Sequence, residues 1–590
     1  MTTAISLSDF RAVLRDRGLD AFLVPMDDAH MGEYSPASER RITALSGFKG
    51  SAGFIVVTQS QALIWTDGRY LIAIKAEVDQ SEWTICDITA KTPLASVGDF
   101  VSEGQVVGYD AAVQTMASVE QWNIALGKIG ASLKAVDGNP VDALWTAQPQ
   151  PPATPAVPHP IEFAGKASAD KRKEIGAALA EDGLTAQVLN QSESVAWLLN
   201  TRADDIAGLP VARSMATVYA DGSVDWFIDP ARVSDAMHQA LDNGVAVFHP
   251  DEMPSRLGGM KGPVGLDKGT CNAAILNALK AGGVQTRNNG DPVVLPRALK
   301  NAVEQQGARD AQRRDARAVI RFSRWLAEHA DITSVSERDV IDQILALREA
   351  NEDPVPMNGA SFGTIAGFGG NAALAHYSVT DATNAQLAPG TMLLVDSGGQ
   401  YYNGTTDITR VWAIGGQSTE RQRRDYTLTL KGHLAIERCV FPKGTKGSHI
   451  DILARQYMWL EGIDFNHGTG HGIGSYLGVH EGPQRIAKRS DDAPMQPGML
   501  LSNEPGIYRE DESGVRIENV ELVVELENGF MAFETLTLVP YDRALIEVSM
   551  LTDEERAQVD AYHARIVAEV GPDLSGDDLA FLEKAAAPLS

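Results

Sequence analysis

The residues best suited to chemistry lie in the last third of the chain, among apolar and glycine-rich runs. The stretch VDSGGQYYNGTTDITRVW places Asp396 at the end of an apolar run and Asp407 after a Gly/Asn-rich turn. This pattern predicts a β-hairpin that carries two carboxylates. Burial of a carboxylate is costly unless the group is paired, hydrogen-bonded or bound to a metal. The alternative is that Asp396 caps the turn and Asp407 pairs with Arg410.

A glycine-rich stretch, NHGTGHGIGSYLGVHEGP, carries His467, His471 and His480. Imidazole is the commonest neutral metal ligand, and glycine lets a backbone approach a site closely. His467 and His471 have the spacing of a helical zinc-binding pair, but the glycines between and after them disfavour a helix. We therefore expect one histidine to bind metal and the others to act as donors or proton carriers. A purely structural loop is the alternative.

Two further acidic residues stand in MLLSNEPGIY and GVRIENVELVV. Glu504 ends an apolar run, and Glu518 alternates with apolar residues as in a strand. On such a strand Arg516 and Glu518 share one face. A surface strand with a salt bridge would explain Glu518 equally well, but it would not explain Glu504 in so apolar a setting.

Together these motifs supply four carboxylates and one imidazole. Oxygen and nitrogen donors favour harder divalent ions such as Mn²⁺, with Co²⁺ and Zn²⁺ also compatible. Four negative charges balance two such ions, which can hold a hydroxide between them when they are roughly 3.5–4 Å apart and so form a nucleophile at neutral pH. The sequence contains no nucleophile elbow, phosphate-binding loop or dinucleotide fingerprint that competes for this role. The expected ligands are Asp396, Asp407, Glu504, Glu518 and one of the three histidines of the glycine-rich stretch.

The segments before this region must position it, and they have an α/β pattern. The proline-rich stretch PQPPATPAVPHP, residues 149–160, reads as an extended connector. The order of elements before it returns after it: GLDA precedes one apolar run and GLTA another, and SAGFIVV is answered by SMATVYA. We expect two similar α/β domains in tandem. The predicted division is residues 1–155, 156–300 and 301–590.

The third domain is expected to be α+β. Helical spacing from Ala302 to Glu328 opens it, after a predicted loop NNGDPVVLPRALK. Further helices are predicted at Gln422–Val440 and His449–Leu460, between apolar runs that end in acidic residues. The tail from Thr552 to Ser590 is predicted to be helical, with a break at Gly571 and Pro572.

Composition excludes several classes of protein. The 590 residues include 51 Lys and Arg against 78 Asp and Glu, a formal net charge of −27, which disfavours nucleic acid as a partner. No apolar run approaches the ~20 residues that a membrane span needs, so we expect a soluble protein. Charged residues interrupt the N-terminus where a secretory signal would be apolar. Only three scattered cysteines occur, at positions 86, 271 and 439, so neither disulfides nor a cysteine zinc site is expected. Because the cysteines do not fit a disulfide framework and no secretory signal is indicated, we expect a cytoplasmic location.

The combined motifs resemble those of the pita-bread metallopeptidases, in particular the long, three-domain Xaa-Pro aminopeptidases (aminopeptidase P). The resemblance covers nearly the whole chain and is strongest from Asn358 to Pro540. The motifs SFGTIAGFGGNAALAHY, LLVDSGGQYYNGTTDITR, FNHGTGHGIGSYLGVHEGP, EPGIY and GVRIENVELVV occur there in the family's order. WTDGRY at Trp65–Tyr70 is similar to a signature of the family's first domain.

The resemblance implies roles for individual residues. By the resemblance, the family's ligand positions are occupied by Asp396, Asp407, His471, Glu504 and Glu518, with Asp407 and Glu518 expected to bridge the two ions. Glu504 falls on the position that orients or deprotonates the attacking hydroxide. Histidines around the scissile bond are implied as well, and His480 and His376 are suited to stabilise the oxyanion or to protonate the proline nitrogen. The substrate contacts implied are His376, His467, His480, Arg516 and Arg69.

The activity implied is removal of one N-terminal residue from peptides whose second residue is proline. The resemblance also implies a homodimer and two divalent metal ions, with manganese expected. Prolidase, which cleaves only Xaa-Pro dipeptides, is the nearest alternative. A non-catalytic pita-bread binding module is an alternative of a different class, which the complete ligand set disfavours. Creatinase and methionine aminopeptidase are disfavoured by the complete ligand set and by the two preceding domains, respectively.

Overall fold

Two sheets of identical topology occupy the N-terminal half of the chain. In each, two antiparallel pairs are flanked by parallel pairs, in the orders β4-β3-β2-β1-β5-β6 and β12-β11-β10-β8-β13-β14. This shared order confirms the predicted repeat of two similar α/β domains. The first sheet has strands β1 (Ala21–Pro25), β2 (Phe54–Thr58), β3 (Ala62–Thr66), β4 (Thr84–Asp87), β5 (Val106–Asp110) and β6 (Ser132–Val136). The second has β8 (Ala186–Leu189), β10 (Met215–Tyr219), β11 (Val224–Phe227), β12 (Val245–Phe248), β13 (Val264–Leu266) and β14 (Thr286–Asn288).

Strand β1 shows why these strands have unbroken apolar sequences. Its five residues AFLVP are all buried. Phe22 and Val24 pack in one apolar cluster, whereas Ala21 and Leu23 pack in another. A strand that is covered on both faces is apolar at every position and does not alternate with polar residues.

The computed structural model describes residues 5–329, 331–351, 353–489 and 493–589. By its internal contacts the chain forms two units, of which the first holds both α/β sheets. The first unit comprises Met1–Pro160, Lys166–Ile206 and Pro210–Val293, and the second comprises Ile161–Gly165, Ala207–Leu209 and Val294–Ser590. In the part of the chain described, no helix has a segment of the length and apolarity that a bilayer crossing requires.

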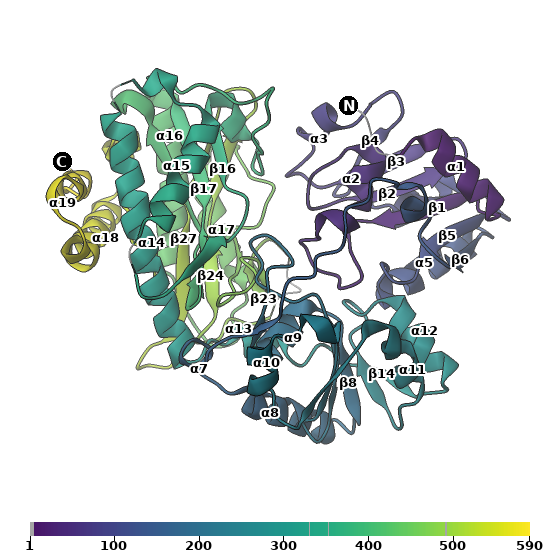
Figure 1. Cartoon of the computed structure of the whole chain (residues 1–590). Coiled ribbons are helices and arrows are strands. Elements are labelled where there is room, and N and C mark those ends of the chain that lie inside the picture. Colours follow the sequence, from purple (N-terminus) through teal and green to yellow (C-terminus); the bar gives the residue numbers. More distant parts are fainter. Residues whose placement is uncertain (1–4, 330, 352, 490–492, 590) are drawn as a thin grey trace. The chain divides into compact units, whose positions relative to one another are not determined.

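The second unit contains a three-stranded sheet, β16-β17-β20, and a six-stranded sheet, β21-β28-β27-β24-β22-β23. Figure 1 shows helices α14 to α17 alongside these strands. The three-stranded sheet consists of β16 (Ile365–Phe368), β17 (Met392–Ser397) and β20 (Ile408–Ala413). The six-stranded sheet consists of β21 (Val440–Phe441), β22 (Gly470–Gly472), β23 (Glu481–Ile486), β24 (Leu500–Asn503), β27 (Asn519–Glu525) and β28 (Met531–Thr535). Smaller pairings join β15 (Met357–Ala360), β18 (Gly399–Tyr401) and β19 (Gly404–Thr405), and separately β25 (Gly506–Arg509) and β26 (Ser513–Arg516).

The predicted helices of this unit are present. Helix α14 spans Ala302–Glu328 as predicted, and Asn301 and Glu304 form a capping box at its start. The loop predicted before it is wrong in one respect, because it contains the short helix α13 (Val294–Ala298), in which Pro296 lies in the first turn, where no amide donor is needed. The other helices are α15 (Glu337–Glu349), α16 (Glu420–Glu437), α17 (Gly447–Trp459), α18 (Asp553–Val570) and α19 (Gly576–Ala585). A 3₁₀ turn at Gly571–Asp573 separates the last two at the predicted break.

The glycine-rich histidine stretch forms strand β22 and is not helical, as predicted. The glycines allow β22 to lie close against its neighbours. A Cβ atom at Gly470 would lie 1.9 Å from the carbonyl oxygen of Ser502, and one at Gly472 would lie 2.2 Å from that of Glu481. Only glycine at these two positions lets His471 lie between β23 and β24.

We predict that Gly470→Ala destabilises the protein by about 3 kcal/mol or more, because the backbone of β24 must move to admit the methyl group. Thermal unfolding measures the loss. The matched control is Gly468→Ala in the same segment, whose Cβ would lie 3.4 Å from the nearest atom, an ordinary contact. Equal melting temperatures for the two variants would contradict this account.

Candidate metal centre

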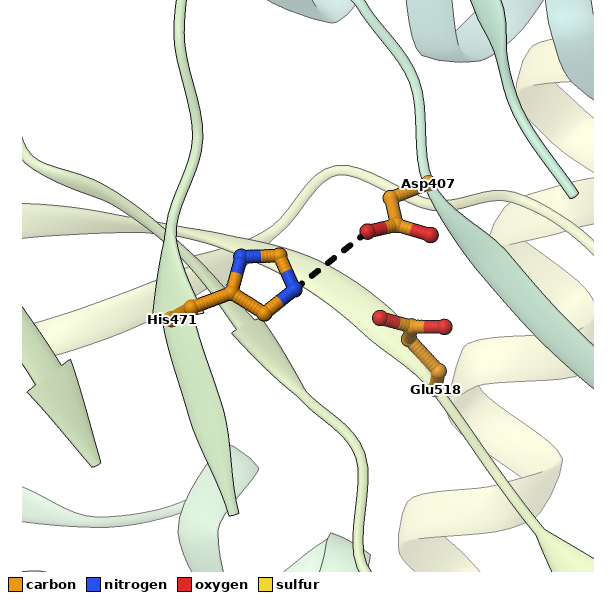
Figure 2. Close-up of side chains that lie close together, drawn as sticks. All are labelled: Asp407, His471 and Glu518. Atoms are coloured by element: carbon orange, nitrogen blue, oxygen red, sulfur yellow. Dashed lines mark ion pairs between the residues drawn. The ribbon is translucent and has the colours of Figure 1, made fainter. Parts of the chain in front are cut away.

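Three of the predicted ligands converge in the second unit. Asp407, His471 and Glu518 each offer one ligand atom, and these atoms all lie within 4.8 Å of one another. Figure 2 shows the two carboxylates and the imidazole facing a common space, with His471 Nε2 3.5 Å from Asp407 Oδ2. Their arrangement is that of a site able to hold a cation.

Glu504 and Asp396 border the same space. Glu504 Oε1 lies 3.6 Å from His471 Nε2. Asp396 is linked to Glu504 through Arg516, whose guanidinium lies 2.5 Å from Asp396 Oδ2 and 3.9 Å from Glu504 Oε2. The other oxygen of Asp396 is buried and accepts no hydrogen bond from any described residue. The structure therefore brings together all five residues of the predicted ligand set.

Strand pairing explains how residues far apart in sequence meet. In the antiparallel pair β17–β20, Asp396 lies opposite Thr409, and Asp407 immediately precedes β20. Glu504 follows β24, and Glu518 lies in the two-residue interval between β26 and β27. Each carboxylate thus stands at or near a strand end, where the backbone is fixed on one side by the sheet.

The hydrogen bonds of His471 fit metal binding. Its Nδ1 lies 3.0 Å from the carbonyl oxygen of Gly472, an acceptor, so Nδ1 carries the proton. In the neutral ring this leaves a lone pair on Nε2, which faces the carboxylates of Asp407 and Glu504. Acceptors that face one another without a proton between them are suited to a shared cation, and this donor set of oxygen and nitrogen atoms fits a divalent metal ion.

The carboxylates repel one another in the metal-free chain. Burial, with added repulsion from Glu518 and Asp396, raises the pKa of Asp407 well above its usual range. Burial, with added repulsion from Asp396 and Glu504, does the same to the pKa of Glu518. Burial also raises the pKa of Glu504 to about 7, against the opposing charge of Arg516. Ionisation of the whole set therefore requires added positive charge.

The remaining predicted histidines lie on segments that contact residues of this space. The rings of His480 and His471 meet edge to face with centroids 4.3 Å apart. His467 Nε2 lies 2.8 Å from the hydroxyl of Tyr508. His376 follows Ala375, whose carbonyl accepts a hydrogen bond from Arg516, so the turn that carries His376 borders the site.

The two predicted arginine contacts differ in setting. Arg516 is buried and binds Asp396, Tyr508, Thr409 and Ala375. Arg69 lies in the first unit, where its guanidinium forms a two-pronged ion pair with Asp67. Contact of either arginine with substrate stays a prediction.

Two alternatives raised by the sequence are wrong. Arg410 does not pair with Asp407, because its guanidinium binds the backbone of Glu518 and Thr409 instead. Glu518 and Arg516 do not lie on a surface strand, because both are buried. Three residues that contact predicted ligands or their partners were not predicted from the sequence: Tyr508, Thr409 and Ser502. Of these, Thr409 could have been found from the sequence. It lies two residues after Asp407, so the two side chains fall on the same face of an extended run.

Models of known families match nearly the whole chain. Residues 306–525 match Metallopeptidase family M24, and residues 529–589 match the C-terminal region of peptidase M24. Residues 7–143 and 147–304 each match a Creatinase/Prolidase N-terminal domain. Aminopeptidase P1 of Arabidopsis thaliana is 32% identical over 647 residues, with 99% of both chains covered. This chain belongs to metallopeptidase family M24, among its aminopeptidase P members. Another such member, the probable Xaa-Pro aminopeptidase P of Sordaria macrospora, is 35% identical over 611 residues, with 98% of both chains covered.

Solved structures agree with this M24 assignment. The X-prolyl aminopeptidase of Caenorhabditis elegans, described as a cytosolic enzyme with a di-nuclear active site, superposes with a TM-score of 0.94 at 31% identity, covering 99% of this chain and 100% of that one. The Xaa-Pro dipeptidase of Bacillus anthracis covers 64% of this chain and 99% of its own at 23% identity and a TM-score of 0.52, a likeness of fold alone. The predicted fold class, two creatinase-type α/β domains followed by a pita-bread domain, is confirmed.

We predict that removal of metal makes stability fall as pH rises. The raised pKa values of Asp407, Glu504 and Glu518 mean that the folded, metal-free chain holds protons that the unfolded chain releases from about pH 4.5 upward. Their stabilising contribution is complete below that pH. The contribution of Glu504 is lost as pH rises through about 7, and those of Asp407 and Glu518 are lost as pH rises through their own raised pKa values. Bound divalent ions replace those protons, so the metal-loaded protein loses less stability as pH rises.

Melting temperatures of chelator-treated and Mn²⁺-loaded protein, recorded from pH 5 to pH 8, test this prediction. Other titrating groups act in both samples, so the difference between the two melting curves isolates the carboxylates. We expect the difference to widen as pH rises. A difference that is constant or narrows across this range would show that the carboxylates do not share one electrostatic site.

Proposed function

We propose that this chain is an Xaa-Pro aminopeptidase, which hydrolyses the bond between an N-terminal residue and a following proline. The observation that carries the proposal is the assembly of five ligand-type residues in a chain related over its full length to aminopeptidase P proteins. Peptides with proline in the second position are the proposed substrates, and nucleic acid and membranes are not proposed as partners.

The proposed metal ligands, which would together hold two divalent ions, are Asp396, Asp407, His471, Glu504 and Glu518. Mn²⁺ is the proposed ion, because the donors are four carboxylates and one imidazole and include no sulfur. Two bound divalent ions supply a polarised scissile carbonyl and a water molecule acidic enough to attack at neutral pH.

Glu504 is the proposed general base. Its carboxylate lies beside His471, and Ser502 Oγ lies 3.4 Å from Oε1. Arg516 lies 3.9 Å from the other oxygen and favours the ionised form, which accepts a proton from the attacking water.

The leaving group in this reaction is the proline nitrogen. It has no hydrogen in the peptide and must gain one as the bond breaks. His480 lies against His471 at the edge of the site, and His376 stands on the bordering turn. We assign these two histidines to stabilise the oxyanion and to deliver that proton. His467, bound to Tyr508, is assigned to the substrate side of the site with Arg516. A substrate contact by Arg69 is retained as a separate proposal.

The proposal extends to the organisation of the protein. The division into residues 1–155, 156–300 and 301–590 is retained as a proposal, as are a homodimeric assembly and a cytoplasmic location. The description of the Caenorhabditis elegans relative as cytosolic favours the last of these.

Substrate length distinguishes the proposed activity from prolidase activity. We expect the Mn²⁺-loaded protein to release the first residue from a tripeptide and from a pentapeptide with proline second. Replacement of that proline by alanine should reduce kcat/KM by at least tenfold. Cleavage of Xaa-Pro dipeptides alone would show that the protein is a prolidase. Absence of any hydrolysis, together with absence of bound metal, would favour a binding module.

We predict that Glu504→Ala lowers kcat by about a thousandfold or more, because it removes both the general base and a metal ligand. Glu504→Gln removes the base with less change in shape. The control is Glu510→Ala, which removes an exposed carboxylate nearby. Circular dichroism and metal content of each variant separate loss of fold, loss of metal and loss of chemistry. Turnover of Glu504→Gln within tenfold of the parent would contradict the assigned role.

A further inference from the structure

Arg410 is a buried cation with an unusual set of partners. Its side chain is among the largest that are fully buried. One terminal nitrogen donates to the carbonyl oxygens of Thr409, at 3.0 Å, and Glu518, at 2.6 Å. The other donates to Asn519 Oδ1 and the carbonyl of Val539, both at 2.8 Å, and to the hydroxyl of Tyr562 at 3.1 Å. All five acceptors are neutral.

The guanidinium keeps its charge at any ordinary pH, and burial of a charge is costly without a paired anion. Among the residues that the structure describes, no carboxylate forms an ion pair with Arg410, although buried Glu437 feels its charge. A neutral side chain would avoid the cost. The arginine therefore indicates a position where several backbone and side-chain acceptors must be held in one arrangement.

Glu518 is the metal-site residue held by this arrangement. Its N–H donates to the carbonyl of Thr409 at 3.2 Å, and its own carbonyl accepts from Arg410. Its side-chain Oε2 accepts from Thr409 Oγ1 at 2.7 Å. Because side chains alternate along a strand, Thr409 reaches the carboxylate from one face of β20 while Arg410 reaches the backbone from the other. Glu518 lies between β26 and β27, so these contacts take the place of a strand ladder.

The C-terminal helix α18 holds the far side of Arg410. Tyr562 on this helix accepts from Arg410, and its hydroxyl lies 2.8 Å from the carbonyl of Thr537, to which it donates. The next residue, His563, accepts the N–H of Tyr541 on Nε2 at 3.1 Å. Tyr541 in turn packs over the Arg410 guanidinium and accepts from Asn519, the neighbour of Glu518. Helix α18 is thus joined by two routes to the backbone of Glu518 and to the side chain of Asn519.

We propose that Arg410 and Tyr562 are positioning residues of the metal centre, through which helix α18 fixes Glu518 in its ligand position. This inference rests on the proposed function, in that it takes Glu518 to be a metal ligand. It assigns the C-terminal region, residues 529–589, a part in metal affinity, although none of its side chains belongs to the proposed ligand set.

The test uses the full chain and three variants, freed of metal by chelation and titrated with Mn²⁺ in a calorimeter. Tyr562→Phe removes the one acceptor of Arg410 that helix α18 supplies and should weaken Mn²⁺ affinity by about tenfold, the lower end of the range for partners of metal ligands. Arg410→Lys keeps the positive charge but lacks the planar, many-donor guanidinium group. This variant should weaken Mn²⁺ affinity by tenfold to about a hundredfold.

The matched control is Tyr426→Phe. Tyr426 is also fully buried, and its hydroxyl accepts from the N–H of Asp542 at 3.2 Å, but it does not hydrogen-bond to Arg410. Loss of this hydroxyl should lower the melting temperature without changing Mn²⁺ affinity. If Tyr562 has a purely structural role, Tyr562→Phe will likewise lower the melting temperature and leave Mn²⁺ affinity unchanged.

The outcomes separate this inference from the proposed function. If the parent protein binds no Mn²⁺, the proposed metal centre is wrong and this inference falls with it. If the parent binds Mn²⁺ and hydrolyses Xaa-Pro peptides, but Tyr562→Phe binds as tightly as Tyr426→Phe, the positioning role is overturned alone. Should Arg410→Lys fail to fold, Tyr562→Phe, which loses a single hydroxyl, still decides the question.

Discussion

Four carboxylates approach one another in the interior of the second unit, and their mutual repulsion is the constraint that its structure must meet. Burial and repulsion raise the pKa values of Asp407 and Glu518 well above the ordinary range and that of Glu504 to about 7. Without added cations some of these groups must keep protons. Two divalent ions supply charge that protons otherwise supply, so the feature that makes the metal-free site unfavourable also makes the site bind metal.

The surrounding residues hold the proposed ligands in place through contacts that need no metal. Arg516 binds Asp396, Thr409 binds the carboxylate of Glu518, and the carbonyl of Gly472 selects the tautomer of His471. Glycines in β22 bring that histidine close to the neighbouring strands. A site assembled on paired strands, with its ligands fixed by their own hydrogen bonds, loses less conformational freedom when it binds an ion.

Much of the fold and of the candidate site could be predicted, because the sequence patterns that indicate them are local. The capping box of Asn301 and Glu304 marks the start of α14, and glycines at alternate positions exclude a helix around His471. The sequence echo between the first two domains corresponds to two sheets with one strand order. The roles of Arg410 and Tyr508 could not be predicted, because their partners are backbone carbonyls and side chains that only strand pairing brings near. The helix around Pro296 was missed because proline near the start of a helix has no local signature that separates it from proline in a loop.

The most direct test of the metal centre is a crystal structure of the Mn²⁺-loaded protein with anomalous data collected near the manganese absorption edge. The account predicts two anomalous peaks in each chain, with Asp407 and Glu518 in contact with both ions and Asp396, His471 and Glu504 completing the ligand set. A single peak, or a pair of peaks away from these five residues, would contradict it.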